Sequence, residues 1–231
     1  RRNGWSPQNR RSSGVESAHN RPMTWHILPY SPPAGRIERW LSLDGSRLEM
    51  RPLPPLQPGD EERVGDWLNS LSPQTRRNRF FGTIREFSGL AVHQLLSIDP
   101  ARDYLLVVLR HDGDQQQPIG GGRFVHDDGQ GAAFSLLLGD EWQGQGIGRR
   151  LLKALLREAS RRGLRRMHGD VLADNAAMLG LARSLGFDAV EAPAGSAVDA
   201  GVIHIVRTLR PGRFHPWRRL QRNFMRKYSL R

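Results

Sequence analysis

The sequence predicts a mixed α/β domain, of the α/β or α+β class, in which helices flank a single sheet. Runs of β-type residues and runs with helical spacing of apolar residues follow one another along the 231 residues. Their order is strand, helices, three strands, helix, strand, helix, strand. Polar turns separate the three central strands, which favours a β-meander inside a mixed sheet.

The first elements begin at Arg47. The run "RLEMRPLPP" alternates in polarity before it meets prolines, as a short strand would. Apolar residues with helical spacing from Val64 to Leu71 predict a helix, and Ser72 with Pro73 predicts the start of a second one. "SGLAVHQLLSIDP" indicates one more helical piece.

The middle of the chain changes to strand patterns. "DYLLVVLRHD", "PIGGGRFVHDD" and "GAAFSLLLGDEW" are three β-type runs, separated by the turn-forming stretches "GDQQQ" and "DGQG". These runs predict three consecutive antiparallel strands.

The last third predicts two helices and two strands. Apolar residues from Ile147 to Ala159 lie on one helical face, opposite several cations, and Gly163 ends that helix. "RRMHGDVLAD" is a strand pattern, "NAAMLGLARSLGF" a helix beginning at Asn175, and "VIHIVRTL" a final strand.

Charge divides the chain into three parts. The first 22 residues hold five Arg and one Glu, and residues 211–231 hold six Arg, one Lys and no acid, so the ends supply eleven of the twelve net positive charges. We expect a basic, disordered or loosely docked arm at 1–46, a folded domain at 47–209 and a basic amphipathic tail at 210–231. A high pI suggests nucleic-acid binding, and this charge pattern limits that inference to the two ends of the chain.

Composition excludes several classes of site. The chain has no cysteine, so a disulfide framework, a thiolate nucleophile and a Cys-based metal site are impossible. No run approaches the roughly 20 apolar residues of a transmembrane span, and no signal peptide is visible. We expect a cytoplasmic protein.

Three glycines stand at a strand-to-helix junction in "DEWQGQGIGRRLLKALL". A dinucleotide fingerprint fails because Arg149 occupies the third glycine position, and a P-loop fails because no Lys-Ser or Lys-Thr pair follows. One alternative is a purely structural turn. The other is an anion site, because glycines permit close approach to a helix N-terminus with unpaired N–H groups.

The segment "QGQGIG", Gln143 to Gly148, resembles the Q/R-x-x-G-x-G/A motif of the GCN5-related N-acetyltransferase (GNAT) superfamily. The order of elements is similar as well, and so is "ADNAAMLGLARSLGF", with an Asn before a helix that ends in Leu-Gly-Phe. "LSPQTRRNRFFG" resembles the bacterial protein-lysine acetyltransferase-like domains of that superfamily. The resemblance covers roughly residues 47–209.

The resemblance implies a GNAT-type, mostly antiparallel sheet and acetyl-CoA as cosubstrate, with no metal. It implies direct transfer of an acetyl group to an amine, possibly a protein lysine. The cofactor-binding positions that it implies are Leu137, Leu138, Gln143, Gly144, Gln145, Gly146, Ile147, Gly148, Arg149 and Asn175.

The catalytic residues are less clear. Protein-acetylating relatives carry a glutamate ten residues before the motif glutamine, and here that position is Ala133. Ser135 shares the strand face of Ala133, and Asp170 lies on the next strand, so these two are the catalytic candidates, acting through a water. Asp140 and Glu141 are expected to shape the loop.

Two further groups have plainer interpretations. His168 is more often a packed strand histidine than a base, His126 belongs to a polar turn, and no His pair has metal-ligand spacing. The tail interleaves aromatics with arginines, so an acidic partner, nucleic acid or a membrane surface is a conceivable contact. Because of Ala133, a catalytically impaired acyl-CoA sensor is the alternative function.

Overall fold

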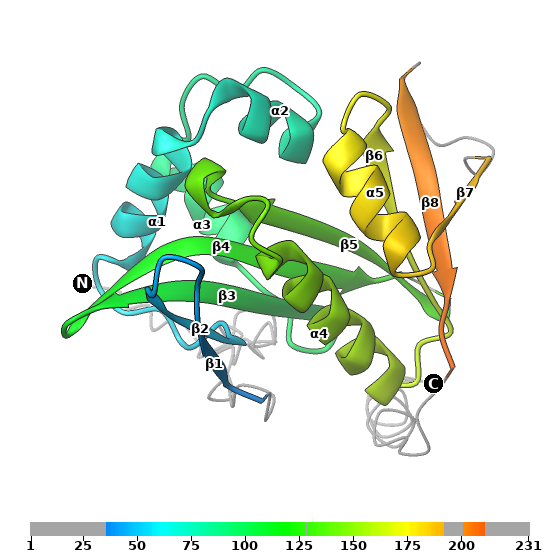
Figure 1. The fold of residues 1–231 in the computed structure, drawn as a ribbon, viewed down its shortest axis with the longest axis horizontal. Helices are drawn as coiled ribbons and strands as arrows, with labels where there is room; N and C mark the ends of the chain where they lie inside the picture. Colours follow the sequence, from blue (N-terminus) through cyan, green and yellow to red (C-terminus); the bar gives the residue numbers. More distant parts are fainter. Residues whose placement is uncertain (1–35, 128, 192–200, 211–231) are drawn as a thin grey trace, which may run out of the picture. The chain divides into compact units, whose positions relative to one another are not determined.

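The computed structural model describes residues 36–127, 129–191 and 201–210. The predicted tail and most of the predicted arm lie outside these ranges. The described strands form one sheet in the order β1-β2-β3-β4-β5-β6-β8-β7, shown in Figure 1. Their bounds are β1 Glu38–Leu41, β2 Arg47–Pro52, β3 Asp103–Asp112, β4 Gln115–His126, β5 Gly131–Leu138, β6 Arg166–Leu172, β7 Asp188–Val190 and β8 Val202–Thr208.

Every neighbouring pair in the sheet is antiparallel except β5 and β6, which are parallel. The predicted mixed, mostly antiparallel sheet is therefore confirmed. Helix α4 connects β5 to β6, as a parallel pair requires a crossover. The helices are α1 Asp60–Ser70, α2 Pro73–Phe80, α3 Gly89–Leu96, α4 Ile147–Arg161 and α5 Ala176–Ser184, and a short 3₁₀ turn spans Asp140–Trp142.

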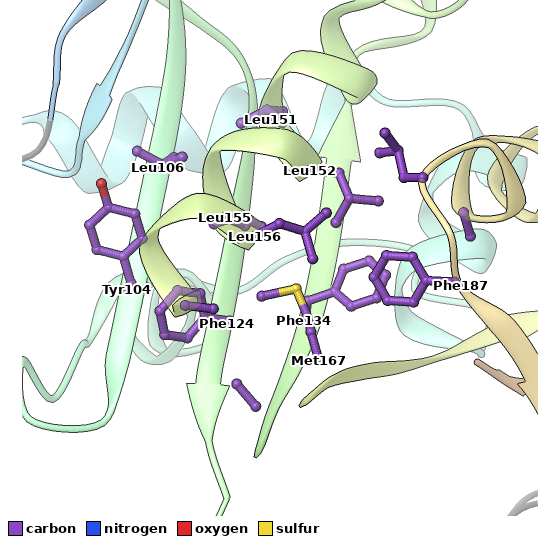
Figure 2. Packing of buried hydrophobic residues seen from close by; sticks show 14 of the residues in the cluster. Tyr104, Leu106, Phe124, Phe134, Leu151, Leu152, Leu155, Leu156, Met167 and Phe187 are labelled. Atoms are coloured by element: carbon purple, nitrogen blue, oxygen red, sulfur yellow. The ribbon is translucent and has the colours of Figure 1, made fainter. Parts of the chain in front are cut away.

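The two faces of the sheet carry separate apolar cores. On β3, Leu106 and Val108 join the core under α4 and α5, whereas Leu105 and Val107 contact the core under α1 and α3. This is the alternation expected of a strand buried on both faces. Figure 2 shows Leu151, Leu152 and Leu155 of α4 in the same cluster of buried residues as Phe124, Phe134 and Phe187.

Helix α4 lies very close to β4. A Cβ built at Gly122 would lie 2.7 Å from Leu136 Cδ2 and 3.1 Å from Leu155 Cδ1. The glycine run of β4 therefore leaves space that side chains of β5 and α4 fill. This packing holds the middle of α4, at Leu151 and Leu155, against the sheet.

The structure corrects the sequence prediction at two places. Residues 38–41, assigned to a disordered or loosely docked arm, form β1 and pair with β2 from Glu38↔Met50 to Leu41↔Arg47. The three-residue strand β7 was not predicted; it is held by pairing with β8. No helix in the described ranges is long and apolar enough to cross a bilayer.

Candidate functional site

The sheet opens between β5 and β6. The two strands pair only at Gly131↔Arg166, Ala132↔Met167 and Ala133↔His168. Beyond Ala133, no strand among the described residues pairs with the remainder of β5 on this side. The result is an internal split in the sheet whose floor is the Ala133–His168 pair.

The glycine loop leads from the open end of β5 into α4. Gly144 and Gly146 have φ angles of 73° and 79°, and nothing lies within 4 Å of a Cβ built at either position. These backbone angles favour glycine, and the space beside them is open. Gly148, in contrast, has a normal φ and permits contact with Leu181 and Leu138, 3.4 and 3.5 Å from a built Cβ.

The N-terminus of α4 differs from those of the other described helices. Ser72, Ser88 and Asn175 cap α2, α3 and α5 with side-chain oxygens, and α1 has three acids in its first turn. Helix α4 begins at Gly146 with no side-chain cap and no acid in its first turn. Its first N–H groups and its positive dipole end therefore suit an external anion.

A basic depression of about 410 Å³ adjoins this helix end. Its lining consists of Gly146, Arg149, Arg150, Lys153 and Arg157 of the loop and α4, and Glu38 of β1. Arg157 Nη2 lies 2.6 Å from Glu38 Oε1, and the Arg150 guanidinium lies 5.1 Å from the Trp40 ring centroid. The strand that the sequence assigned to the arm thus forms one wall of a cationic surface.

The side chains of the predicted cofactor-binding residues hold the loop in shape. Gln143 Nε2 donates to Thr75 Oγ1 at 2.9 Å and to the Leu138 carbonyl at 3.2 Å. Gln145 Nε2 donates to the Glu141 carbonyl at 2.8 Å. Because these side chains are hydrogen-bonded within the protein, the main chain of the loop is the part that remains available to a ligand.

Three other predicted positions also have structural partners. The side chain of Ile147 is 1% exposed and belongs to the core, so it can offer only its main chain. Arg149 Nη1 donates to Ser184 Oγ at 2.6 Å and joins α4 to α5. The Asn175 side chain accepts from Met178 N at 3.0 Å, as the N-cap of α5.

Leu137 and Leu138 lie on the strand that borders the split. Gly139 N donates to Ile119 O on β4 at 2.9 Å. The N–H and C=O groups of successive residues point to opposite sides of a strand. Those of Leu136 and Leu138 therefore point toward the split, and those of Leu137 point toward β4. Leu138 O accordingly accepts the Gln143 amide.

Asp140 and Glu141 shape the loop, as expected. Asp140 accepts hydrogen bonds from Ser72 N, Ser72 Oγ and Thr75 Oγ1 at 2.9, 2.6 and 2.7 Å. Burial would raise the pKa of Asp140, but the hydrogen bonds from Ser72 and Thr75 outweigh it and hold that pKa below its ordinary value. Glu141 accepts from Trp142 Nε1 at 2.8 Å.

The predicted catalytic residues lie on the face opposite α4. Ala133 is exposed there and Ser135 is half-buried, with the same alternation as Leu137. Asp170 Oδ1 lies 2.6 Å from His204 Nδ1 of β8. Ser135 makes no side-chain hydrogen bond to another described residue, whereas the Asp170 carboxylate is paired with the His204 imidazole.

Sequence reasoning missed a row of polar groups on this face. His168 Nε2 lies 3.4 Å from Asp127 Oδ2, and the His168 and His204 ring centroids are 5.4 Å apart. Together Asp127, His168, His204 and Asp170 form a row beside the split in which two imidazoles lie between two carboxylates. The "HDD" turn and the "MHGD" strand contain three of them, but only the sheet register joins them.

Burial and neighbouring groups shift the pKa values of two residues in this row, His168 and Asp127. Burial, and then the charge of His204, lower the pKa of His168, while Asp127 acts in the opposite direction. Burial alone would raise the pKa of Asp127, but the amides of Gly131 and Gly129 and the Arg166 guanidinium hold it below its ordinary value. Near neutral pH His168 is therefore a neutral imidazole beside a carboxylate. No group of three metal-ligating side chains occurs within the described ranges.

The fold and the site define an α/β protein whose central sheet parts beside a helix N-terminus that has no side-chain cap. The family model of the acetyltransferase (GNAT) family matches residues 65–187. The chain is 34% identical over 153 residues to acetyltransferase PA5475 of Pseudomonas aeruginosa, a match that covers 65% of this chain and 81% of the relative. The chain belongs to the GNAT family of acetyltransferases.

Two further similarities support this assignment. The chain is 32% identical over 136 residues to acetyltransferase Pat of Mycolicibacterium smegmatis, covering 58% of this chain and 40% of Pat. It shares its fold with the crystal structure of the GNAT domain of S. lividans PAT, at a TM-score of 0.62 and 23% identity, over 75% of this chain and 97% of that domain. The predicted resemblance to this family is confirmed.

Proposed function

We propose that the protein transfers an acetyl group from acetyl-CoA directly to an amine, and that the amine is a protein lysine. The observation that carries this proposal is the uncapped N-terminus of α4, reached through Gly144 and Gly146, at the open end of the β5–β6 split. Main-chain N–H groups at such an end suit the pyrophosphate of coenzyme A.

The basic depression supports the choice of donor. Coenzyme A carries a further phosphate on its ribose, and Arg149, Arg150 and Lys153 provide cations next to the loop. From the pyrophosphate, the pantetheine arm would extend along the open edge of β5. The main-chain N–H of Leu136, which faces the split, would then donate to the thioester carbonyl and to the oxyanion that forms on attack.

The acceptor side supports an amine. The carboxylate of Asp170, 44% exposed, lies on the same face of the sheet as the exposed Ala133, where it would attract an ammonium group. Ser135 and Asp170 remain our candidates for polar contacts with this group. The choice of a protein lysine rests on the resemblance of "LSPQTRRNRFFG" to lysine-acetylating domains.

The second candidate function is an acyl-CoA sensor with impaired catalysis. Ala133 favours it, because a methyl side chain cannot accept a proton where relatives carry a glutamate. Both functions need the same donor site, so turnover distinguishes them.

A binding and a turnover assay test the proposal together. We expect acetyl-CoA to raise the melting temperature and the wild type to release CoA thiol with lysine peptides. Lys153→Gln should weaken acetyl-CoA binding roughly tenfold, since one charge-assisted contact contributes about 1.5 kcal/mol or more. Arg85→Gln, in the loop between α2 and α3, is the matched control. Binding without turnover on any amine would favour the sensor, and no binding would refute both functions.

A further inference from the structure

The missing glutamate leaves a gap that the neighbouring strand can fill. Ala133 and His168 are register partners at the floor of the split, and partners in adjacent strands point to the same face. The strands lie about 4.8 Å apart, so the side chain at 168 begins next to the position from which a carboxylate at 133 would extend. No carboxylate or other titratable group of β5 lies on this face, whose residues are Ala133, Ser135 and Leu137.

A second residue holds the imidazole. Asp127, in the turn between β4 and β5, lies 3.4 Å from His168 Nε2. Asp127 is itself fixed by the amides of Gly129 and Gly131 at 2.8 and 3.0 Å, and by Arg166 at 3.4 Å. A carboxylate that holds one ring nitrogen leaves the other nitrogen, Nδ1, to accept a proton.

We propose that His168, positioned by Asp127, is the general base of this acetyltransferase in place of the absent glutamate. The inference rests on the proposed function and identifies the residue that makes it possible with alanine at 133.

The proton and bond changes balance. His168 Nδ1 takes a proton from the acceptor ammonium, directly or through one water. The neutral amine attacks the thioester carbonyl, a C–N bond forms, and the C–S bond then breaks. The proton left on the new amide nitrogen passes to the departing thiolate, and His168 later releases its proton to solvent. The products are an amide, CoA thiol and one proton.

The charged groups that face His168 predict its pH behaviour. These are Asp127 from the β4–β5 turn, His204 from β8 and Arg166 from its own strand. With its pKa lowered, His168 should be protonated only below its ordinary value of 6.5, so kcat/KM should fall on the acid side of that value. Asp127→Asn should move this limb to lower pH, and His204→Gln should move it to higher pH.

The decisive variant is His168→Gln. We expect kcat to fall about a hundredfold or more, as for loss of a general base, while the melting-temperature shift with acetyl-CoA stays unchanged. His93→Gln, at an exposed histidine of α3 that is paired with Glu61 of α1, is the matched control and should keep full activity. Ala133→Glu in the His168→Gln background should restore turnover.

Several outcomes would overturn the inference. Unchanged kcat in His168→Gln would do so, and a roughly hundredfold loss of kcat in Asp170→Asn beside a fully active His168→Gln would transfer the role to the Asp170–His204 pair. A wild type that binds acetyl-CoA but needs Ala133→Glu for any turnover would also refute it. Failure of the wild type to bind acetyl-CoA refutes the proposed function instead. Titration of the His168 ring by NMR in the folded variants measures its pKa without any assay of activity.

Discussion

Asp140 connects the glycine loop to the opposite helix layer. It accepts three hydrogen bonds from Ser72 and Thr75 at the start of α2. Thr75 in turn accepts the amide of Gln143, the first residue of the glycine motif. The conformation of the loop therefore depends on α2 as well as on α4.

Replacing Asp140 by alanine should destabilise the fold by about 1–2 kcal/mol at pH 7, since hydrogen bonds to a charged acceptor at a helix N-terminus are lost. The lowered pKa stabilises the folded state at pH values above the ordinary 3.8, and this contribution disappears as pH falls through the folded pKa. Urea unfolding between pH 7 and 3 should show the two proteins converge. Asp112→Ala, at the exposed end of β3, should change little, and an equal loss there would contradict the assignment.

At the residue scale, the sequence predicted the conformation of the glycine loop better than the grouping of polar side chains beside the split. Gly144 and Gly146 are recognisable because their neighbours in sequence are their neighbours in space, whereas Asp140 is held by Ser72 and Thr75, which are distant in sequence. Ala133 and His168 lie on different strands, and Asp127 lies in a turn. Their meeting depends on the register of three strands, which local pattern does not contain.

At the element scale, the position of α4 decides where the anion site lies. Its apolar face packs on β4 and β5, and Gly122 removes the side chain that would hold the helix away. Close packing at the sheet centre thus places the first turn of α4 beside the end of β5.

Gly122→Val should destabilise the protein by about 1–3 kcal/mol, because the added methyl groups overpack a well-filled contact with Leu136 and Leu155. Thermal unfolding measures the loss. Gly180→Ala is the control: nothing lies within 4 Å of a Cβ built there, and it is in α5. That variant should gain up to about 1 kcal/mol. If both variants were equally stable, the close packing at Gly122 would not contribute to the free energy of unfolding.

The elements that the sequence missed are short. β1 has four residues and β7 three, too few for a period of two to emerge from the local pattern. Their existence depends on the pairing that β2 and β8 offer. The longer strands and the helices were predictable because each carries its own periodicity.

At the scale of the whole molecule, charge and fold are separate properties. The ends supply eleven of the twelve net charges, and the middle of the chain is close to neutral. Within the described part, many arginines face carboxylates, such as Arg123 with Asp103 and Arg162 with Glu158. The basic pI therefore describes the ends and not the acetyltransferase domain.

Binding of polyanions should depend on the basic residues at the two ends of the chain. We expect the full chain to bind single-stranded RNA or heparin with an affinity that falls steeply as salt rises, because binding releases counterions. Deleting residues 1–22 and 211–231 should abolish this binding and leave acetyl-CoA binding intact. Fluorescence anisotropy at several salt concentrations measures both. Binding that survives both deletions would place a polyanion site on the folded domain.

The parting of β5 and β6 also has a mechanical consequence. In the described part of the sheet, β5 and β6 share only three register pairs, and this short contact joins the portion β1 to β5 with the portion β6 to β8. The cohesion of the two portions therefore depends also on the core that they share with α4 and α5 and on the pairing of Asp127 with Arg166 and His168. A ligand bound between β5 and β6 would contact both portions of the sheet. Its binding would therefore make the protein more rigid as well as place the ligand for reaction.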